Sequence, residues 1–298
     1  MILAVDLGGT KIAAARVSRA GQLFGRLERP TPPWGGRAVV EAVVTLVERL
    51  AERGPFTAIG VDVPGLARPG GRVWAPNLPG WEDMPLGREL YRRFRVPVVV
   101  ESDRNAFVVG EAWRGVARGV RDVVFLAVGT GIGAGILSGG HLIRGHGELA
   151  GAVGWMAVRE KFLPEYGRVG CLETLASGRG IESVAAKSFG QKLSAADLVR
   201  RARQGDRRAQ AILRRAGEAL GLAMANLVDV LNPAMIVVGG GVAEAGEWVL
   251  KPARETMRRW AQPLAVKQVR VARSRLGPRA ALLGAAKLAL DACKQPTT

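Results

Sequence analysis

Asp6-Leu7-Gly8-Gly9-Thr10-Lys11 lies between two apolar runs, Ile2 to Val5 and Ile12 to Val17. The runs predict two strands joined by a tight turn, and no helix follows the glycines as it would in a Walker loop or a dinucleotide fingerprint. Glycines let backbone N–H groups approach an anion closely, so the turn is a candidate phosphate site. Thr10 can add a hydroxyl contact, and Asp6 can hold a water molecule of a Mg²⁺ ion. Taken alone, the turn is equally consistent with a plain glycine hairpin.

The bulk composition predicts a soluble protein of two domains. The chain has 298 residues, of which 48% are hydrophobic and 23% charged. No run approaches the roughly 18 uncharged residues of a membrane span. The first residues lead directly into a predicted strand, so no signal peptide is expected. Two cysteines are too few for a disulfide framework, and we expect a cytoplasmic protein with no membrane partner.

The net charge of +17 has two explanations. Arginines make up 35 of the 43 basic residues, and many stand in pairs on predicted helices, namely Arg92-Arg93, Arg200-Arg201, Arg207-Arg208, Arg214-Arg215 and Arg258-Arg259. A nucleic-acid binder would show such a charge, but no aromatic-rich basic stripe or recognition helix accompanies it. A compositional bias towards Arg, Ala and Gly is the favoured explanation, and the charge would still attract anionic ligands such as ATP.

The hydrophobic pattern predicts two cycles of strands and helices. The first cycle has strands at 2–8, 12–18, 22–29, 57–63 and 96–100, helices at 36–53, 86–94 and 105–113, and a long loop over 64–85. The second has strands at 122–128, 136–137 and 234–238 and helices at 209–231 and 280–289. The second cycle repeats the opening order of strand, glycine turn with a threonine, and strand. Two related lobes with phosphate turns facing one cleft are therefore expected.

Three glycine-rich turns follow apolar strands, near 8–9, 129–135 and 239–241. The third could hold a nucleoside against a helix N-terminus, although glycines also simply permit tight turns. Glu101-Ser102-Asp103-Arg104-Asn105 follows the predicted strand 96–100. A carboxylate at that end of a strand can take the proton of a hydroxyl that attacks a phosphoryl group. Ser102 or Asp103 would also suit a helix N-cap, and both roles can coexist.

Several motifs, in this order and spacing, resemble the ROK family of sugar kinases and repressors. They are Asp6 to Lys11, Val63-Pro64-Gly65, Asn77-Leu78-Pro79-Gly80-Trp81, Glu101-x-Asp103-x-Asn105, Gly129-Thr130-Gly131-Ile132-Gly133 and Gly170-Cys171-Leu172-Glu173. The resemblance implies an α/β, two-lobed, actin-like ATPase fold. The first lobe comprises residues 1–115 together with a C-terminal helix at 279–298 that packs back on it, and the second lobe comprises residues 116–278. It implies phosphorylation of a sugar hydroxyl with ATP and Mg²⁺, and a homodimer.

The resemblance also implies roles for individual residues. Asp103 matches the catalytic base. Nucleotide contacts are implied for Asp6, Gly8, Gly9, Thr10, Lys11, Thr130, Gly131, Gly133, Gly239, Gly240 and Gly241. Contacts to the sugar are implied for Gly65, Asn77, Ser102, Asp103 and Glu173.

The sugar side and the zinc loop depart from the family pattern. The family usually reads Ala-Gly-Glu-Ile-Gly-His where this chain has Ala152 and Trp155 at the Glu and His positions. That Glu and His contact sugar hydroxyls, and the His also binds zinc. Pro164 and Tyr166 replace two zinc cysteines, so only Cys171 remains and no structural zinc is expected. We expect apolar packing of Trp155 and Tyr166 in place of the metal.

Three sugar-facing positions, 102, 152 and 155, therefore differ, and each lost hydrogen-bonding partner costs roughly 1–3 kcal/mol. Glu148 could move in to replace the missing carboxylate, although a solvated loop glutamate is the default. The sequence predicts a kinase for a sugar or polyol, with its activity on glucose left open. The alternative is an ATP-binding homologue with little or no hexokinase activity. A repressor is disfavoured, because the motif beginning at Asp6 leaves no room for a preceding helix-turn-helix domain.

Overall fold

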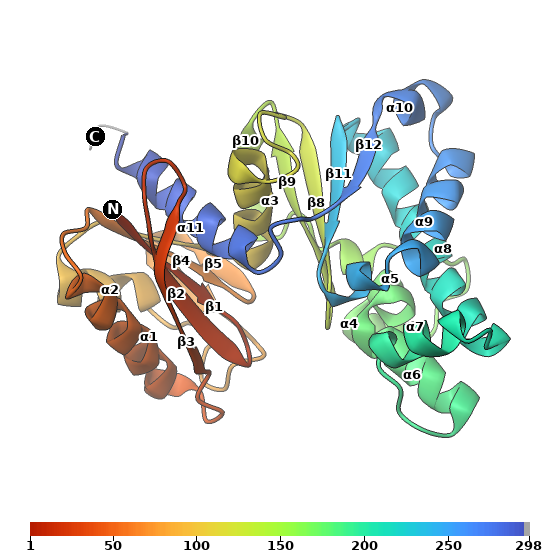
Figure 1. Ribbon diagram of the computed structural model, residues 1–298, viewed down its shortest axis with the longest axis horizontal. Helices are drawn as coiled ribbons and strands as arrows, with labels where there is room; N and C mark the ends of the chain where they lie inside the picture. Colours follow the sequence, from red (N-terminus) through yellow and green to blue (C-terminus); the bar gives the residue numbers. More distant parts are fainter. Residues whose placement is uncertain (295–298) are drawn as a thin grey trace. The chain divides into compact units, whose positions relative to one another are not determined.

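The computed structural model describes residues 1–294, which form two compact units (Figure 1). The first unit comprises Met1–Gly119, Arg144–Leu149 and residues 276–294, and the second comprises Val120–Ile143 and Ala150–Arg275. The last helix, α11 (Arg279–Ala292), belongs to the first unit. The end of the expected helix, 295–298, lies outside the described residues. No helix within 1–294 is long and apolar enough to cross a bilayer.

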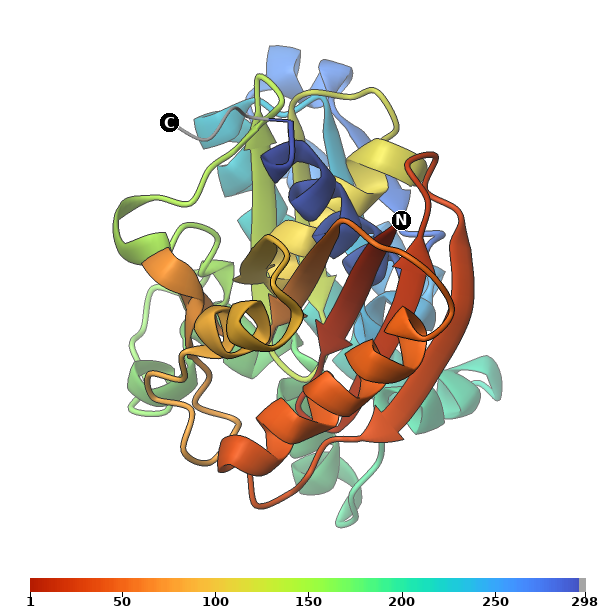
Figure 2. The same cartoon turned by 90° about the vertical axis from the view of Figure 1, so that its left-hand side faces the viewer.

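The first unit is built on a five-stranded sheet in the order β3-β2-β1-β4-β7. Its strands are β1 (Ile2–Leu7), β2 (Lys11–Val17), β3 (Leu23–Pro30), β4 (Ala58–Val63) and β7 (Val98–Ser102). The first three pair antiparallel, and β1, β4 and β7 run parallel. Because side chains alternate along a strand, Leu3 and Val5 pack with α1 (Gly36–Ala51), while Ile2 and Ala4 pack with α11. Figure 2 shows α1 lying across this sheet.

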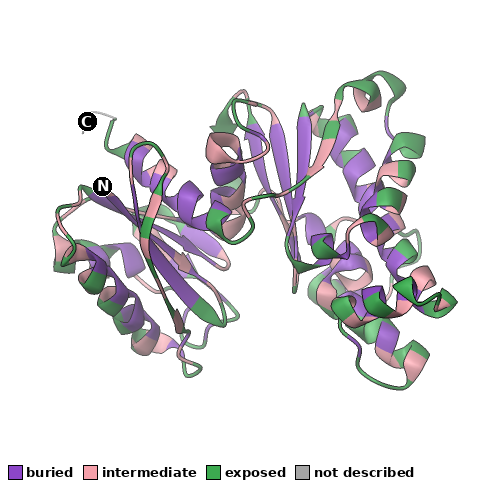
Figure 3. Cartoon of the chain, in the orientation of Figure 1, coloured by how far each residue is buried: buried purple, intermediate pink, exposed green. Residues whose placement is uncertain are grey.

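The second unit repeats this topology in a sheet of order β10-β9-β8-β11-β12. Its strands are β8 (Val123–Val128), β9 (Ile132–Ser138), β10 (His141–Leu142), β11 (Met235–Gly239) and β12 (Arg270–Arg273). Again three strands pair antiparallel, and β8, β11 and β12 run parallel. The inner strands of both sheets are largely buried, whereas the edge strands β3, β10 and β12 have no buried residue (Figure 3). The internal repeat predicted from the two glycine turns is confirmed as a repeated sheet topology.

Helices account for most of the rest of both units. The first unit also has α2 (Leu86–Phe94) and α3 (Asp103–Arg114); the second has α4 (Tyr166–Val169), α5 (Cys171–Ala176), α6 (Gly178–Phe189), α7 (Ala195–Arg203), α8 (Arg207–Leu231), α9 (Glu247–Trp260) and α10 (Pro263–Gln268). The spacing of apolar residues along α8 would place Val230 on the apolar stripe of the helix, but Val230 is 80% exposed. At the last turn that stripe passes through Leu227, Val228 and Leu231 instead.

The segment 64–85 is not the long loop that its glycines and prolines predict. It contains a hairpin of β5 (Leu66–Arg68) and β6 (Arg72–Trp74), joined by a 3₁₀ turn at Pro69–Gly71. Gly70 and Gly71 both have positive φ, which lets the chain reverse within three residues. The predicted strand 96–100 is also displaced. Because β7 ends at Ser102 and α3 begins at Asp103, Glu101 and Ser102 are strand residues.

Candidate active site

Unpartnered polar atoms gather at one place in the first unit. Within residues 1–294, six buried side-chain nitrogen and oxygen atoms lack a hydrogen-bond partner. Five of the six belong to Asp62, Ser102, Arg104 and Asn105. These residues lie at the ends of β4 and β7 and in the first turn of α3. Leaving a buried polar atom unpaired costs about 1–3 kcal/mol, so their concentration around Asp103 is typical of a site built for a polar ligand.

Three carboxyl groups lie at this place, those of Asp6, Asp62 and Asp103. Asp6 and Asp62 are paired residues of the neighbouring strands β1 and β4, so their side chains project from the same face. Burial raises the pKa of Asp6 to about 6, although interaction with Asp62 opposes the rise. Burial also holds the pKa of Asp62 well above its ordinary value, and the charges of Asp6 and Asp103 add to this effect.

Asp103 is the first residue of α3 and remains partly accessible. Burial raises the pKa of Asp103, while the backbone N–H and guanidinium of Arg104 oppose that rise. Ser102 precedes the helix, but its side chain makes no capping hydrogen bond. Ser102 therefore occupies the N-cap position of α3, as the alternative expects, but its hydroxyl does not cap the helix. The positive end of α3 favours an ionised Asp103, the form that a proton acceptor needs.

The segment Arg144–Leu149 is held to this site by two arginines. Arg104 Nη2 donates to the carbonyl oxygen of Glu148 at 2.9 Å. Arg144 pairs with Glu101 Oε2 at 2.8 Å, and Glu101 Oε1 accepts from Asn105 Nδ2 at 3.0 Å. The Glu148 carboxylate lies 3.7 Å from Arg144 Nε. A sugar contact by Glu148 would therefore have to compete with this ion pair.

The opening turn of the chain is well ordered by its own contacts. Gly8 N donates to Lys11 O at 2.9 Å, and Thr31 Oγ1 donates to Gly8 O at 2.7 Å. Thr10 is exposed after the turn. The Lys11 ammonium lies 3.1 Å from Glu28 Oε1, so this expected nucleotide contact is engaged with a carboxylate of β3.

Each of the three glycine turns contains one glycine that the protein's own packing does not require. An added Cβ would lie too close to backbone or ring atoms at Gly8 (2.9 Å), Gly239 (2.4 Å) and Gly240 (2.5 Å), whereas at Gly131 it would meet only the side-chain carboxylate of Glu173 (2.9 Å). At Gly9, Gly129 and Gly241 it would meet nothing within 4 Å, and the φ angle is not positive. The protein's own packing therefore does not explain these three glycines. An anion approaching the bare backbone would explain them.

In the second unit, Glu173 supports the turn that contains Thr130. Glu173 lies on α5, and its Oε2 accepts from the backbone N–H of Ile132 at 2.7 Å. Gly178 N donates to Gly129 O at 2.7 Å on the other side of the turn. Thr130 itself is exposed and Gly133 follows it within β9. The turn is thus held from two helices while its threonine stays open to solvent.

The remaining residues expected at the sugar lie between β4 and α2. Gly65 has φ +119° and runs so close to β6 that a Cβ would lie 2.2 Å from Trp74 O, which explains the glycine. Asn77 is exposed on the turn between β6 and α2. Trp81 anchors that turn through a hydrogen bond from Nε1 to Gly36 O at 3.1 Å. None of the contacts described in the structure joins Asn77 to Asp103.

In the loop that corresponds to the family's zinc site, apolar packing takes the place of the metal only in part. Tyr166 and Cys171 are buried together in the core of the second unit, and the Phe162 ring meets Tyr166 edge-on at 6.2 Å. Trp155, by contrast, is 56% exposed, so the expectation that it fills the space is wrong. Met156 and Leu163 are partly buried and pack against the core of the second unit. Within the described chain no group of three or more His, Cys, Asp or Glu residues is arranged to hold a metal ion.

Sequence reasoning did not single out Asp62 or Arg144. Asp62 is a charged residue inside the otherwise apolar run Ala58–Val63, and that interruption was the available signal. Arg144 gave no comparable signal, since it lies in a polar segment and its partner Glu101 is distant in sequence.

Comparisons with known proteins agree over nearly the whole chain. Residues 2–292 match the ROK family. A glucokinase of Thermotoga maritima is 33% identical over 96% of each chain. A ROK hexokinase structure from Thermus thermophilus is 35% identical, with a TM-score of 0.84 over 98% of this chain and 99% of that one. A ROK glucokinase structure from Streptomyces griseus in complex with glucose and AMPPNP is 32% identical, with a TM-score of 0.82 over 97% and 99%.

Proposed function

The chain belongs to the ROK family, and from that premise we propose that it is an ATP-dependent sugar kinase that phosphorylates a sugar hydroxyl. Its similarity to glucokinases and to a hexokinase over nearly full length supports this activity and the actin-like α/β fold class. The relative from Streptomyces griseus binds glucose and the ATP analogue AMPPNP, which supports ATP as the donor. The observation that carries the proposal is the group of unpartnered polar atoms around Asp103.

In the proposed mechanism, Asp103 accepts the proton of the attacking sugar hydroxyl as the oxygen bonds to the γ-phosphorus and ADP departs. The N-terminus of α3 and the Arg104 guanidinium oppose the rise in the pKa of Asp103 that burial causes, and so favour the ionised form that this step needs. Gly9, Gly129 and Gly241 leave bare backbone for the phosphates, and Thr10 and Thr130 add hydroxyl contacts. Mg²⁺ bound with the nucleotide would neutralise phosphate charge, and Asp6 would hold one of its water molecules.

The proposal includes an acceptor preference that differs from that of an ordinary glucokinase. Ser102 and Ala152 offer fewer acceptors to a sugar than the usual residues, and the exposed Trp155 has replaced a histidine. Lost hydrogen bonds to hydroxyls weaken binding by about 1–3 kcal/mol each. We expect poor use of glucose and better use of another sugar or polyol. The proposal also includes a cytoplasmic location and a homodimer. Sedimentation equilibrium would test whether the protein is a dimer.

A panel of acceptors tests this function. The purified protein is mixed with Mg²⁺·ATP and a series of hexoses, amino sugars and polyols, and ADP release is coupled to a visible signal. Product from each active acceptor is then identified by mass spectrometry as a phosphate ester. One acceptor with saturable turnover well above background ATP hydrolysis supports the proposal. Silence across the panel with AMPPNP still bound would favour the non-catalytic ATP-binding alternative.

A further inference from the structure

One buried carboxylate fastens the turn 101–105, which carries Asp103. Glu101 is 4% exposed, and its Oε1 accepts two hydrogen bonds, from the backbone N–H of Ser102 at 2.9 Å and from Asn105 Nδ2 at 3.0 Å. The first donor immediately precedes Asp103 in the chain, and the second follows it by two residues. The Glu101 carboxylate therefore bridges the start of α3 across the residue that we assign as the base.

Asp103 takes its orientation from the same turn. Its Oδ1 accepts from the backbone N–H of Arg104 at 2.7 Å. Because this donor belongs to the turn, a shift of the turn would carry the carboxylate with it. A displacement of about 1 Å at a reacting group can cost roughly a hundredfold in rate. Whatever holds Glu101 in place therefore affects the position of Asp103.

Arg144 supplies the charge and the direction that Glu101 needs. Its Nε and Nη2 both donate to Glu101 Oε2, at 3.0 and 2.8 Å. A buried carboxylate that loses such a partner is strongly unfavourable, and a guanidinium that donates two N–H groups also fixes the direction of the carboxylate. The two oxygens of Glu101 are thus divided between the turn and Arg144.

The segment Arg144–Leu149, which carries this arginine, is tied to the turn a second time. It clusters with the first unit, although the residues on both sides of it in the chain belong to the second. Glu148 has φ +63°, which is uncommon for a residue other than glycine, and its carbonyl oxygen accepts from Arg104 Nη2 at 2.9 Å. Backbone strain of this kind persists where surrounding contacts enforce it, and it is concentrated at functional sites.

We propose that Arg144 is a positioning residue for phosphoryl transfer. Through Glu101 it keeps the turn 101–105 in the geometry in which Asp103 can accept the proton of the acceptor hydroxyl. Arg144 itself does not touch the substrates in this role. The role rests on the proposed function, because it requires that Asp103 acts as the base.

The test compares Arg144 with another arginine beside the same cavity. Arg144 and Arg88 both line a cavity of about 640 Å³ at β7, and Arg88 forms no ion pair within residues 1–294. Arg144→Met removes both donors, Arg144→Lys keeps one cation, and Arg88→Met is the matched control. Values of kcat and KM are measured for the full-length proteins on the best acceptor of the panel. Calorimetry gives their affinity for Mg²⁺·AMPPNP, and thermal melting checks their folding.

We expect Arg144→Met to lower kcat about tenfold or more while the affinity for Mg²⁺·AMPPNP stays within about threefold of the wild type. Arg144→Lys should lose less, since one ammonium can still reach Glu101. Arg88→Met should stay within about twofold of the wild-type kcat. Arg144→Met combined with Glu101→Gln should lose no more than the worse single variant, because the two side chains act as one unit.

Hydrogen exchange adds a readout that does not depend on turnover. In Arg144→Met, peptides that cover residues 101–106 should exchange their backbone amides faster than in the wild type. Peptides of α1, which lies outside the site, should exchange at the wild-type rate. If Arg144→Met does not fold, the same comparison is made with Arg144→Lys, for which a smaller change at 101–106 is expected.

Three results would overturn this role while leaving the proposed function intact. One is an active wild type in which Arg144→Met and Arg88→Met have the same kcat. Another is a double variant whose loss is the sum of the two single losses, which would mean that Arg144 acts independently of Glu101. The third is unchanged exchange at residues 101–106. A wild type that phosphorylates no acceptor of the panel would overturn the proposed function, and this role with it.

Discussion

At the scale of single residues, the proposed active site contains a group that makes the fold less stable than it could be. Asp62 costs stability because burial makes its ionised form unfavourable. Natural proteins commonly keep destabilising residues at functional sites, and substitutions that stabilise such a site often reduce activity. Asp62 is the register partner of Asp6, the residue that the proposed function assigns to the nucleotide.

This cost predicts the pH dependence of an Asp62→Asn variant. Because the folded-state pKa of Asp62 is raised above the ordinary 3.8, the wild type has its full stability from this group only below that value. It loses that stability as pH rises towards the folded-state pKa. The amide does not titrate, so the variant should be more stable than the wild type at pH 7.5, with a gain that shrinks to nothing near pH 4. Urea unfolding at several pH values measures this. A gain that is the same at every pH would contradict the account.

A second prediction separates the two glycines of the opening turn. Gly9→Ala should leave the melting temperature within about 2 °C of the wild type, because the added methyl meets nothing within 4 Å. It should weaken Mg²⁺·AMPPNP binding about tenfold, because the methyl occupies the path of the phosphates. Gly8→Ala is the matched comparison, since its Cβ would lie 2.9 Å from Lys11 O and should lower the melting temperature. If Gly9→Ala bound Mg²⁺·AMPPNP as tightly as the wild type, this turn would not be part of the nucleotide site.

Sequence reasoning reached Asp103 but not Asp62, for a physical reason. Asp103 follows an apolar run, where a strand ends and polar side chains can meet a substrate. Asp62 becomes meaningful only through its register with Asp6, which lies fifty-six residues earlier in the chain. Such pairings across a sheet depend on tertiary structure, and local patterns carry little information about them. The exposure of Trp155 was not predicted either, because the burial of a side chain also depends on tertiary structure.

At the scale of elements, Arg16 joins β2 to the end of α1. Its side chain is 7% exposed and donates to the carbonyl oxygens of Leu50 (2.7 Å), Gly54 (2.8 Å) and Pro55 (2.9 Å). Leu50 lies in the last turn of α1, and Gly54 and Pro55 follow the helix, in a region where backbone acceptors lack their regular helical partners. One buried guanidinium therefore closes the C-terminal end of α1 without a carboxylate.

Arg16→Leu should consequently lower the free energy of unfolding by roughly 3 kcal/mol or more, because it removes three hydrogen bonds that a buried guanidinium donates to carbonyl oxygens. Arg16→Lys should lose less, since one ammonium can still reach some of them. Arg19→Leu alters an exposed arginine just after the same strand and should change stability by less than about 0.5 kcal/mol. Equal losses for Arg16→Leu and Arg19→Leu, measured by urea unfolding, would show that the hydrogen bonds contribute little.

Elements with strong periodicity were predictable, and irregular ones were not. The helix expected over 86–94 is observed with those bounds, and the first three strands lie within about two residues of their expected positions. The hairpin at Leu66–Trp74 was missed because its strands are three residues long and its turn was read as loop. The edge strand β7 was displaced because Glu101 and Ser102 are polar, although their side chains are buried.

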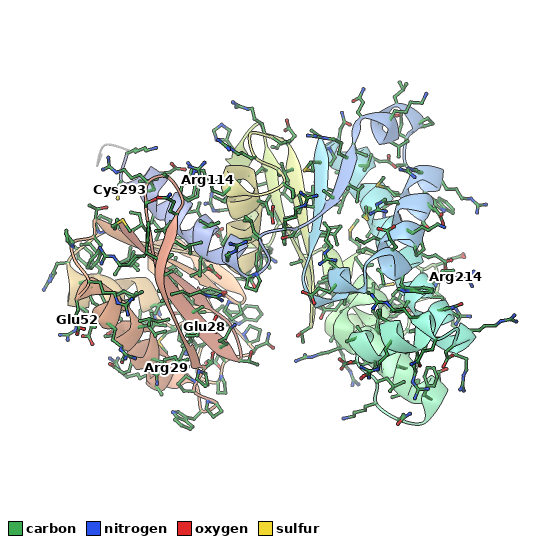
Figure 4. All side chains as sticks on the ribbon, in the orientation of Figure 1. Glu28, Arg29, Glu52, Arg114, Arg214 and Cys293 are labelled. Carbon is green, nitrogen blue, oxygen red and sulfur yellow. The ribbon has the colours of Figure 1, made fainter. Side chains whose placement is uncertain are left out.

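At the scale of the whole molecule, the excess of positive charge and the repeated sheet topology have different origins. The repeat of sheet topology is visible in the chain as two glycine turns between strands. The excess of arginine is spread over helix surfaces; Arg214 of α8, labelled in Figure 4, is 65% exposed and lies 3.8 Å from Glu218. Arginines that are scattered over helix surfaces in this way fit a compositional bias better than a dedicated nucleic-acid surface.

The altered zinc loop leads to a prediction about metal content. Purified protein should contain much less than one equivalent of zinc, and EDTA should leave its melting temperature unchanged. The core around Tyr166 and Cys171 is apolar and needs no metal to close it. Elemental analysis and melting curves with and without chelator check this. Stoichiometric zinc whose removal lowers the melting temperature would contradict it.

The measurement that tests the central claim most directly compares Asp103→Asn with the wild type on the best acceptor of the panel. The account predicts that kcat falls by about a thousandfold or more, because the amide cannot take the proton of the attacking hydroxyl. It predicts that Mg²⁺·AMPPNP still binds within about threefold, because Asp103 acts on the acceptor. An Asp103→Asn variant that transfers phosphate at the wild-type rate would contradict the assignment of the active site.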